Sequence, residues 1–391
     1  MLYGWEYLRS NNGVANGVRL TQGEATLLHG FMLRCELAFV VLVRFAASIC
    51  ANEYQVEEIP RTSKTSLVVK ALNNRGIVVG QAVRNGDIEE AIVWMKGTGL
   101  VYLRSPEGIY SSANDINDAN TIVGYCYSKD RSWNACIWKE FNTEPRVLPL
   151  AETRSDCIAI SEGGDIAGTF VSASGDVCAF FLEKGAGIRK IEHDQRDTVV
   201  PYGLNSRGEV VGSAVTKRRG LTFLDPFVWS VTQGYLSLVS GEMDSGEALG
   251  VNDSGIVVGC LNSRACIWKN RESPKFLATL GGTASEARAI NETGIVVGWS
   301  ETKGGDLIKN LTGIEGITPI FLIRPIYKHA CEWIDERVYD LNDFLPPNSE
   351  WVLKEAVDIN NQGQIIGHGT IKEREAAFIL TPRPSPRSNA D

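Results

Sequence analysis

The stretch Ala248-Leu249-Gly250-Val251-Asn252-Asp253-Ser254-Gly255-Ile256-Val257-Val258-Gly259 decides the fold, because it recurs along most of the chain. Six further copies are Ala71 to Gly80 (ALNNRGIVVG), Ala113 to Gly124 (ANDINDANTIVG), Cys157 to Gly168 (CIAISEGGDIAG), Gly203 to Gly212 (GLNSRGEVVG), Ala287 to Gly298 (ARAINETGIVVG) and Ala356 to Gly367 (AVDINNQGQIIG). Residues that recur in every unit are those that the packing of each unit requires. The repeat therefore predicts the architecture of the protein and no particular activity.

The motif Asn-x-x-Gly between two apolar runs predicts a tight hairpin turn. The Asn side chain caps its own backbone, and the fourth residue takes a positive φ, which Gly adopts without steric cost. Ser161 replaces the Asn in the third copy, whose turn continues through Gly164. The structural turn residues are Asn73, Gly76, Asn117, Asn120, Asn205, Gly208, Asn252, Gly255, Asn291, Gly294, Asn360 and Gly363. An alternative is that Asp115, Asn117, Asp118 and Asn120 bind calcium, but turn chemistry explains the same positions in copies without the acids.

Each turn is followed by a β-branched run and a closing Gly, which together predict a buried strand. A third strand then has the pattern Ala-x-x-Trp or a variant of it, and a fourth strand ends in Leu or a similar residue. A large side chain at one fixed position predicts a wedge between neighbouring sheets, and an aromatic ligand cage is the alternative. The repeat-core tryptophans are Trp94, Trp138, Trp229, Trp268 and Trp333.

The spacing of the closing glycines predicts the architecture. It is 44, 44, 44, 47, 39 and 69 residues, and four strands in about forty-four residues is the size of a propeller blade. The last copy lacks a fourth strand, whereas residues 54–60 have the alternation expected of a strand and the position of a fourth strand without the other three. We therefore expect an all-β, seven-bladed β-propeller of four-stranded blades over residues 52–381, whose ring is closed by residues 54–60. An open solenoid is the rival, but the sequence shows no capping units.

The 69-residue spacing marks an insertion around residues 301–328, between the second and third strands of the sixth unit. It carries many apolar residues, so we expect it either to fold on its own blade or to cover a partner.

The first 51 residues lie outside the repeats. They contain the apolar run Leu37 to Val43 and small residues near Cys50 and Ala51, which resembles a secretory signal peptide. We expect a secreted or periplasmic protein. The alternative is a cytoplasmic protein with a misassigned N-terminus, for which Met32 is a possible true start. Residues 382–391 are expected to form a Pro-rich disordered tail, and no apolar stretch is long enough to predict an integral membrane span.

The charge is acidic: 39 Lys and Arg face 47 Asp and Glu, a net charge of −8. Removal of residues 1–51 leaves 35 basic and 44 acidic residues, or −9. Nucleic acid and anionic membranes are therefore disfavoured as partners.

The cysteines predict neither a zinc site nor a disulfide framework, because no C-x-x-C pair occurs. Cys136, Cys266 and Cys331 occupy a third-strand position that elsewhere holds Ile or Phe, so we interpret them as small core residues.

The phrase A-x-x-I-N-x-x-G-x-I-V-G followed by H-A-x-x-W resembles the bacterial HAF repeat, over about residues 54 to 380. Only His329-Ala330-Cys331 begins with the histidine, and no copy spells the full His-Ala-Phe triplet. The resemblance implies an extracellular repeat protein and transfers no catalytic residue.

The sequence offers little material for catalysis. Four histidines are scattered, and no nucleophile elbow, P-loop or dinucleotide motif occurs. We predict no catalytic, cofactor or metal residues. The carboxylates that depart from the repeat are Glu162, Asp165, Asp225 and Glu332, interpreted as solvated turn or rim residues.

Together these features predict a monomeric, exported binding scaffold for an unknown protein or glycan. The alternative is a polysaccharide hydrolase or lyase that uses carboxylates at the central mouth.

Overall fold

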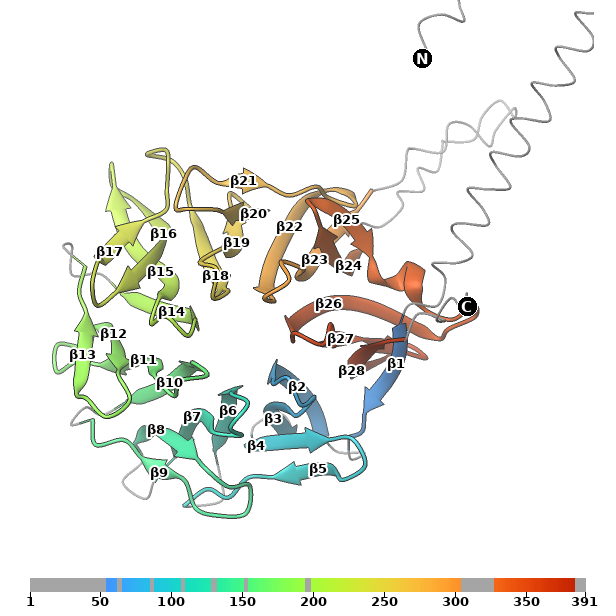
Figure 1. Cartoon of the computed structure of the whole chain (residues 1–391), viewed down its shortest axis with the longest axis horizontal. Helices are drawn as coiled ribbons and strands as arrows, with labels where there is room; N and C mark the ends of the chain where they lie inside the picture. Colours follow the sequence, from blue (N-terminus) through green and yellow to red (C-terminus); the bar gives the residue numbers. More distant parts are fainter. Residues whose placement is uncertain are drawn as a thin grey trace, which may run out of the picture. The chain divides into compact units, whose positions relative to one another are not determined.

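The computed structural model describes residues 54–61, 65–84, 88–106, 110–127, 132–150, 154–193, 198–303 and 327–383. In these ranges the strands form seven four-stranded antiparallel sheets, arranged as blades around a centre (Figure 1). The predicted seven-bladed β-propeller is confirmed. We number the blades 1 to 7 in the order of their first strands.

The first strand of each blade lies innermost, and three more strands follow outward (Figure 1). The inner strands are β2 (Thr65–Leu72), β6 (Ser111–Ile116), β10 (Ser155–Ile160), β14 (Val199–Leu204), β18 (Gly246–Val251), β22 (Gly281–Ile290) and β26 (Trp351–Ile359). The second strands are β3 (Val78–Arg84), β7 (Ile122–Tyr127), β11 (Ile166–Val171), β15 (Val210–Arg218), β19 (Val257–Leu261), β23 (Val296–Thr302) and β27 (Ile365–Ile371).

The third strands are β4 (Ile88–Met95), β8 (Trp133–Trp138), β12 (Val177–Leu182), β16 (Leu221–Ser230), β20 (Arg264–Trp268), β24 (Lys328–Ile334) and β28 (Arg374–Pro382). The outer strands are β5 (Gly99–Tyr102), β9 (Arg146–Val147), β13 (Ile188–Ile191), β17 (Gly234–Ser237), β21 (Lys275–Phe276), β25 (Arg337–Asp340) and β1 (Tyr54–Ile59). A short 3₁₀ helix, η1 (Leu341–Phe344), follows β25.

The ring closes as the sequence predicts. Strand β1 pairs antiparallel with β28, from Tyr54 opposite Pro382 to Ile59 opposite Ala377. The hydroxyl of Tyr54 also donates a hydrogen bond to Glu332 of blade 6 over 3.0 Å. Blade 7 is therefore built from both ends of the repeat array, which leaves no unpaired strand edge between them.

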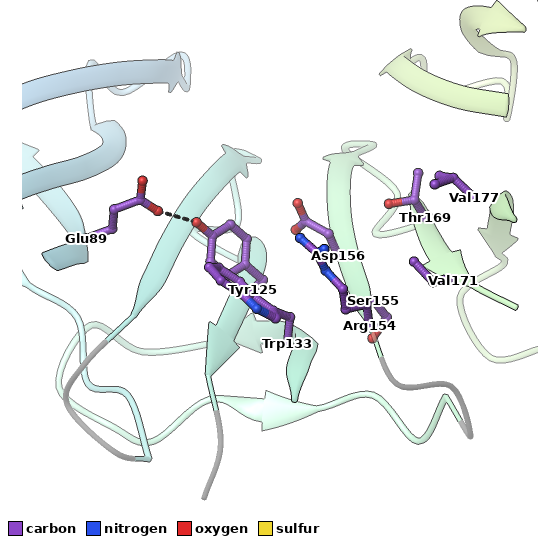
Figure 2. A pocket seen from close by; sticks show the side chains of 9 residues that line it. All are labelled: Glu89, Tyr125, Trp133, Arg154, Ser155, Asp156, Thr169, Val171 and Val177. Carbon is purple, nitrogen blue, oxygen red and sulfur yellow. Dashed lines mark hydrogen bonds between the residues drawn. The ribbon is translucent and has the colours of Figure 1, made fainter. Parts of the chain in front are cut away.

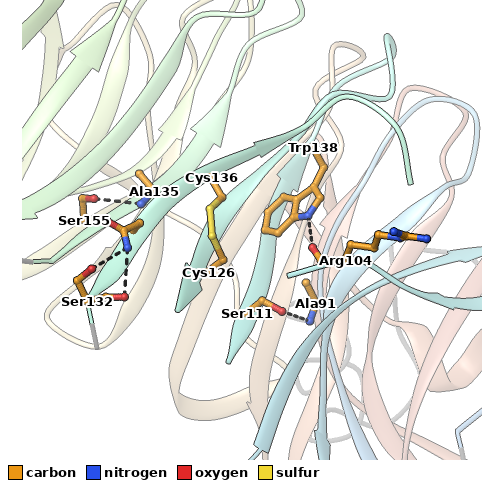
Figure 3. The surroundings of a disulfide bond; sticks show 10 residues. Ala91, Arg104, Ser111, Cys126, Ser132, Ala135, Cys136, Trp138 and Ser155 are labelled. Atoms are coloured by element: carbon orange, nitrogen blue, oxygen red, sulfur yellow. Dashed lines mark hydrogen bonds between the residues drawn. A yellow bond between two sulfur atoms is a disulfide. The ribbon is translucent and has the colours of Figure 1, made fainter. Parts of the chain in front are cut away.

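The hydrophobic core is divided into seven clusters, each of which joins two neighbouring blades. Trp138 of blade 2, for example, packs with Ala91 and Leu103 of blade 1. Its indole N–H donates to the carbonyl oxygen of Arg104 at 2.8 Å (Figure 3). Trp94, Trp229, Trp268 and Trp333 lie in the corresponding clusters, so all five tryptophans are wedges between sheets.

Every inner strand carries a β-bulge three residues before the turn position. The bulged residues are Lys70, Asn114, Ile158, Tyr202, Leu249, Arg288 and Val357. The closing Gly of the second strand lies beneath the bulge, where a Cβ at Gly259 would come within 1.9 Å of the carbonyl oxygen of Glu247. The closing positions thus require glycine, because the backbone of the inner strand lies too close to leave room for a Cβ atom.

The structure corrects the prediction that Cys136 is an unpaired core thiol and that no disulfide is present. Cys126 on β7 and Cys136 on β8 form a disulfide, both within the core between blades 1 and 2 (Figure 3). Cys136 pairs directly with Gly124, and Cys126 lies two residues further along β7. The two cysteines are therefore diagonal neighbours on one face of the sheet, a relation that depends on strand register.

Three predicted segments lie outside the described residues: the signal peptide in residues 1–51, most of the insertion at 301–328, and the tail from residue 384. In the described part of the chain, no helix has the length and apolar character needed to cross a bilayer.

Candidate functional site

The predicted turn residues lie together at one end of the blades. The fourth turn residue has a positive φ in all seven copies, namely Gly76, Asn120, Gly164, Gly208, Gly255, Gly294 and Gly363. The Asn side chain caps the turn, as in Asn252, whose Oδ1 accepts the N–H of Ile256 over 3.0 Å.

The same asparagines also join the blades, which the sequence did not reveal. In six blades the side-chain Nδ2 donates to the backbone carbonyl oxygen of the turn residue in the next blade. The N···O distances are Asn73 to Asn117 3.2 Å, Asn117 to Ser161 3.2 Å, Asn205 to Asn252 2.9 Å, Asn252 to Asn291 3.2 Å, Asn291 to Asn360 3.2 Å and Asn360 to Asn73 3.0 Å. We call these bonds the asparagine ladder.

A second ladder runs beside the first, from the backbone N–H after the turn Asn to a side-chain oxygen in the next blade. Its bonds are Asn74 to Asp118 2.8 Å, Asp118 to Glu162 2.9 Å, Ser206 to Asp253 2.7 Å, Asp253 to Glu292 2.9 Å, Glu292 to Asn361 2.9 Å and Asn361 to Asn74 2.8 Å. At the described boundary between blades 3 and 4, neither ladder has a bond. Ser161 has no amide to donate to Asn205, and Ser206 replaces the longer acceptors found elsewhere.

We expect Ser161→Asn to raise the free energy of unfolding by about 1 kcal/mol, because it supplies the missing Nδ2 donor while keeping an oxygen to cap the turn. Ser161 Oγ now accepts the N–H of Asp165 at 3.0 Å. Urea unfolding of the variant beside the original chain measures the change, and Ser161→Ala, which lacks both groups, is the control. An unchanged or lower stability of Ser161→Asn would show that the boundary does not accept the bond.

Two of the four exceptional carboxylates depart from their predicted role as solvated turn or rim residues. Asp225 is 8% exposed and pairs with Arg218, and Glu332 is 2% exposed and accepts the bond from Tyr54. Both are held by a partner because a buried unpaired carboxylate is costly. Glu162 and Asp165 do lie at the turn end, where they accept backbone N–H groups of Asp118 and Lys184.

The residues considered for calcium are also engaged. The oxygens of Asp115 accept the N–H groups of Ile116 and Ile160, both over 2.8 Å. Asn117 and Asp118 belong to the two ladders. No group of three or more His, Cys, Asp or Glu side chains suited to a metal ion occurs in the described ranges.

A pocket of about 450 Å³ lies between blades 1, 2 and 3 and gathers aromatic and charged side chains (Figure 2). It is lined by Glu89 of β4, Tyr125 of β7, Trp133 of β8, Arg154, Ser155 and Asp156 at the start of β10, Thr169 and Val171 of β11, and Val177 of β12. Because the lining comes from three blades, the pocket depends on how these blades pack together.

Aromatic rings form one wall of this pocket. The rings of Tyr125 and Trp133 lie 4.8 Å apart between centroids, and Tyr110 and Tyr127 pack on Trp133 at 6.0 and 5.6 Å. The guanidinium of Arg154 lies 5.6 Å from the centre of the Trp133 ring, within range of a cation–π contact. The wall therefore combines an apolar face with fixed hydrogen-bond donors.

Two carboxylates face the same space. Glu89 accepts a hydrogen bond from the Tyr125 hydroxyl at 2.5 Å (Figure 2). Asp156 accepts one from Asn114 Nδ2 at 2.8 Å. Burial raises the pKa of Asp156 to about 7, although the positive charge of Lys70 opposes the shift. Near neutral pH, Asp156 can therefore donate or accept a proton.

Sequence reasoning did not identify these pocket residues. The available signal was an aromatic cluster confined to the second repeat: Trp133 lies five residues before the repeated Trp138, and Tyr110, Tyr125 and Tyr127 lie nearby in the chain.

The central channel contains two smaller cavities, of about 210 and 220 Å³. The first is lined by residues from all seven inner strands, including the seven bulged residues. Several of these reach the next blade: Lys70 Nζ donates to Ser112 Oγ at 2.7 Å, and the Tyr202 hydroxyl donates to Glu247 at 2.7 Å. Asp115 and Asp358 line the first cavity, and Glu162, Asp253 and Glu292 line the second, so carboxylates lie both within the channel and at its turn end.

Comparisons with known proteins identify the fold and no family. No protein-family profile matches the chain, and no curated protein matches it. Puromycin hydrolase superposes with a TM-score of 0.51 at 12% identity, over 88% of this chain and 55% of that one.

Two further solved structures are similar at lower scores. A gluconolactonase from Xanthomonas campestris gives a TM-score of 0.39 at 8% identity, over 86% and 93% of the two chains. TolB from Acinetobacter baumannii gives 0.34 at 11% identity, over 52% and 51%. The matched region therefore spans about half the length of TolB and of puromycin hydrolase. Identities this low indicate a shared fold alone.

Proposed function

We propose that this protein is an exported binding scaffold and that the pocket between blades 1, 2 and 3 binds a glycan. The observation that carries the proposal is the aromatic wall of Tyr125 and Trp133 facing Glu89, Arg154 and Asp156. A sugar ring has an apolar C–H face that packs on an aromatic ring, and hydroxyl groups that donate to carboxylates and accept from a guanidinium. A pocket with both kinds of surface offers contacts to each part of a sugar.

Export is supported by three independent features. The N-terminal stretch resembles a signal peptide, the repeats resemble the extracellular HAF repeat, and Cys126 is bonded to Cys136. Disulfides form and persist mainly in oxidising compartments. Cleavage near Ala51, detected by mass spectrometry of the protein purified from its native cells, is the expected outcome of export.

The binding proposal is tested by isothermal titration calorimetry of the full chain with cello-, xylo-, chito- and galacturono-oligosaccharides. We expect at least one to bind, and Trp133→Ala to weaken that binding at least tenfold, which corresponds to about 1.4 kcal/mol. Trp133→Phe should restore much of the affinity, because a ring remains for stacking. The matched control is Tyr102→Ala, at an exposed aromatic on the outer strand of blade 1.

Two results would contradict the proposal. One is the absence of binding across the whole set of oligosaccharides. The other is a titration that Trp133→Ala and Tyr102→Ala leave equally unchanged, which would place the ligand elsewhere.

A polysaccharide hydrolase is the second candidate, favoured by the presence of Glu89 and Asp156 in one pocket. Hydrolysis of a glycosidic bond uses two carboxyl groups, one of which protonates the leaving oxygen while water supplies the new hydroxyl. Asp156 can supply that proton near neutral pH. Release of new reducing ends that Asp156→Asn abolishes, while binding persists, would favour catalysis, and binding without product would favour the scaffold.

A further inference from the structure

The central channel is lined by a repeated set of backbone N–H groups. The residue before each turn position forms a non-hydrogen-bonded pair with the second strand of its blade. Its backbone N–H therefore points away from that strand. Leu204 opposite Val210 is one example, and Ile116 opposite Ile122 is another. Because the inner strand is the edge of its sheet, these N–H groups point into the channel.

Two side chains bind four of these amides in the same way. Asp115 of blade 2 accepts the N–H of Ile116 in its own blade and that of Ile160 in the next, both at 2.8 Å. Asp358 of blade 7 accepts the N–H of Ile359 at 2.8 Å and that of Leu72 in blade 1 at 2.9 Å. Each carboxylate thus spans the boundary between two blades.

The amides of Leu204, Val251 and Ile290, in blades 4, 5 and 6, have no such carboxylate. Within the part of the chain that the structure describes, no side-chain acceptor reaches these three N–H groups. The position that holds Asp115 and Asp358 is occupied here by Gly203, Gly250 and Ala289. These small residues leave the amides open to the 210 Å³ cavity, which they line together with Asp115 and Asp358.

The cavity therefore has two chemically different sides. Blades 2 and 7, which flank blade 1, contribute the two carboxylates, and blades 4 to 6 across the ring contribute the amide donors (Figure 1). Burial raises the pKa of Asp115 to about 7, and the negative charge of Asp358 makes a smaller contribution in the same direction. A positive charge placed between the two carboxylates would relieve this repulsion.

A simple anion does not fit these electrostatics. Lys70 donates to Ser112 and Asn114 and lies in the field of the Asp156 and Glu89 carboxylates, and Arg288 is paired with Glu286 at 2.8 Å, so the positive charges of both channel cations are already opposed by carboxylates. The turn end of the channel adds Glu162, Asp253 and Glu292. A ligand carboxylate therefore needs a positive group of its own.

We propose that the central channel binds a small zwitterion of the amino acid class. Its carboxylate lies on the amides of blades 4 to 6, in the position that Asp115 and Asp358 take on the other blades. Its ammonium group lies toward Asp115 and Asp358. This site is separate from the glycan pocket, so neither proposal depends on the other.

The first test is a titration of the full chain with glycine, 4-aminobutyrate and 6-aminohexanoate, which differ in the distance between their charges. We expect at least one to bind at least tenfold more tightly than both butyrate and butylamine, which carry one of the two groups each. Equal affinity for butyrate would overturn the role of the ammonium group, and no binding by any amino acid would overturn the site.

The second test places a carboxylate of the protein on the same amides. Gly203→Asp is expected to accept the N–H groups of Leu204 and Val251, as Asp115 does in blade 2, and so to weaken amino acid binding at least tenfold. Gly203→Ala is the matched control, because it adds the same Cβ, whose nearest neighbours would be Val211 at 3.1 Å and Leu249 at 3.2 Å. We expect the alanine variant to bind within threefold of the original chain.

A third variant keeps the proposal testable if Gly203→Asp does not fold. Asp358→Asn removes one negative charge from the ammonium side and should weaken amino acid binding at least fivefold. Trp133→Ala, a variant of the separate pocket between blades 1, 2 and 3, should leave amino acid binding unchanged. Equal affinity of the original chain and a folded Gly203→Asp or Asp358→Asn variant would refute the proposed site.

Discussion

Gly259→Ala is expected to lower the free energy of unfolding by about 3 kcal/mol or more, because the added methyl group would meet the backbone of the paired strand. The added Cβ would lie 1.9 Å from the carbonyl oxygen of Glu247 and 3.1 Å from the Cα of Ala248. Both neighbours are backbone atoms of the paired strand, so the clash is relieved only if β18 moves away from β19. Such a movement would disturb the bulge and the inner face of the blade.

Urea unfolding followed by tryptophan fluorescence measures this loss. The control is Gly187→Ala, at an exposed glycine where an added Cβ would meet nothing within 4 Å. We expect the control to change stability by less than about 0.5 kcal/mol. Equal stability of the two variants would show that the strands separate without cost.

Asn252→Ala is expected to cost about 3 kcal/mol, because one side chain holds two bonds in a buried position. Its Oδ1 accepts the N–H of Ile256 within the turn, and its Nδ2 donates to the carbonyl oxygen of Asn291 in the next blade. Removal of the amide leaves the Ile256 N–H unsatisfied, which costs about 1 to 3 kcal/mol, and takes from the Asn291 carbonyl oxygen one of its two hydrogen bonds, the other being with Gly294 N–H.

Asn252→Ser separates the two contributions. Serine keeps an oxygen for the turn, as Ser161 does in blade 3, and loses the bond to the next blade. We expect this variant to lose about 1 kcal/mol, less than the alanine variant. If serine and alanine destabilise the protein equally, the bond between blades contributes and the turn cap does not, contrary to the two-bond account.

The sequence alone determined the turn, the blade and the ring. These features are encoded by local patterns: positive φ at the fourth turn residue, β-branched strands, and a period near forty-four residues. Closure by β1 was also predictable, because the strand missing from the end of the array was present at its beginning. Because the motif occurs seven times, the role of each position could be read from several copies.

The candidate sites were not predictable in this way, because a repeat pattern describes one blade and the sites join several. Trp133 departs from the repeat, whereas Asp156 occupies a position that holds Glu247, Glu286 and Glu355 in other blades, and only the packing of the blades brings both residues to one pocket with Glu89. Likewise, the sequence analysis considered Asp115 only as a calcium ligand or turn residue and did not single out Asp358, because the amides that they bind are brought to them by neighbouring blades.

The sequence by itself therefore determined the hairpin turns, the seven units and their closure, since short-range backbone preferences and hydrophobic periodicity specify them. Only the tertiary structure revealed the contacts within and between blades: the asparagine ladder and its gap beside Ser161, the bulges above the closing glycines, the bond between Cys126 and Cys136, the pocket between blades 1, 2 and 3, and the cavities of the central channel. The physical reason is that strand register and the packing of neighbouring sheets fix these contacts. Their partners lie far apart in the chain or on facing strands, where no local pattern in the sequence records the distance between them.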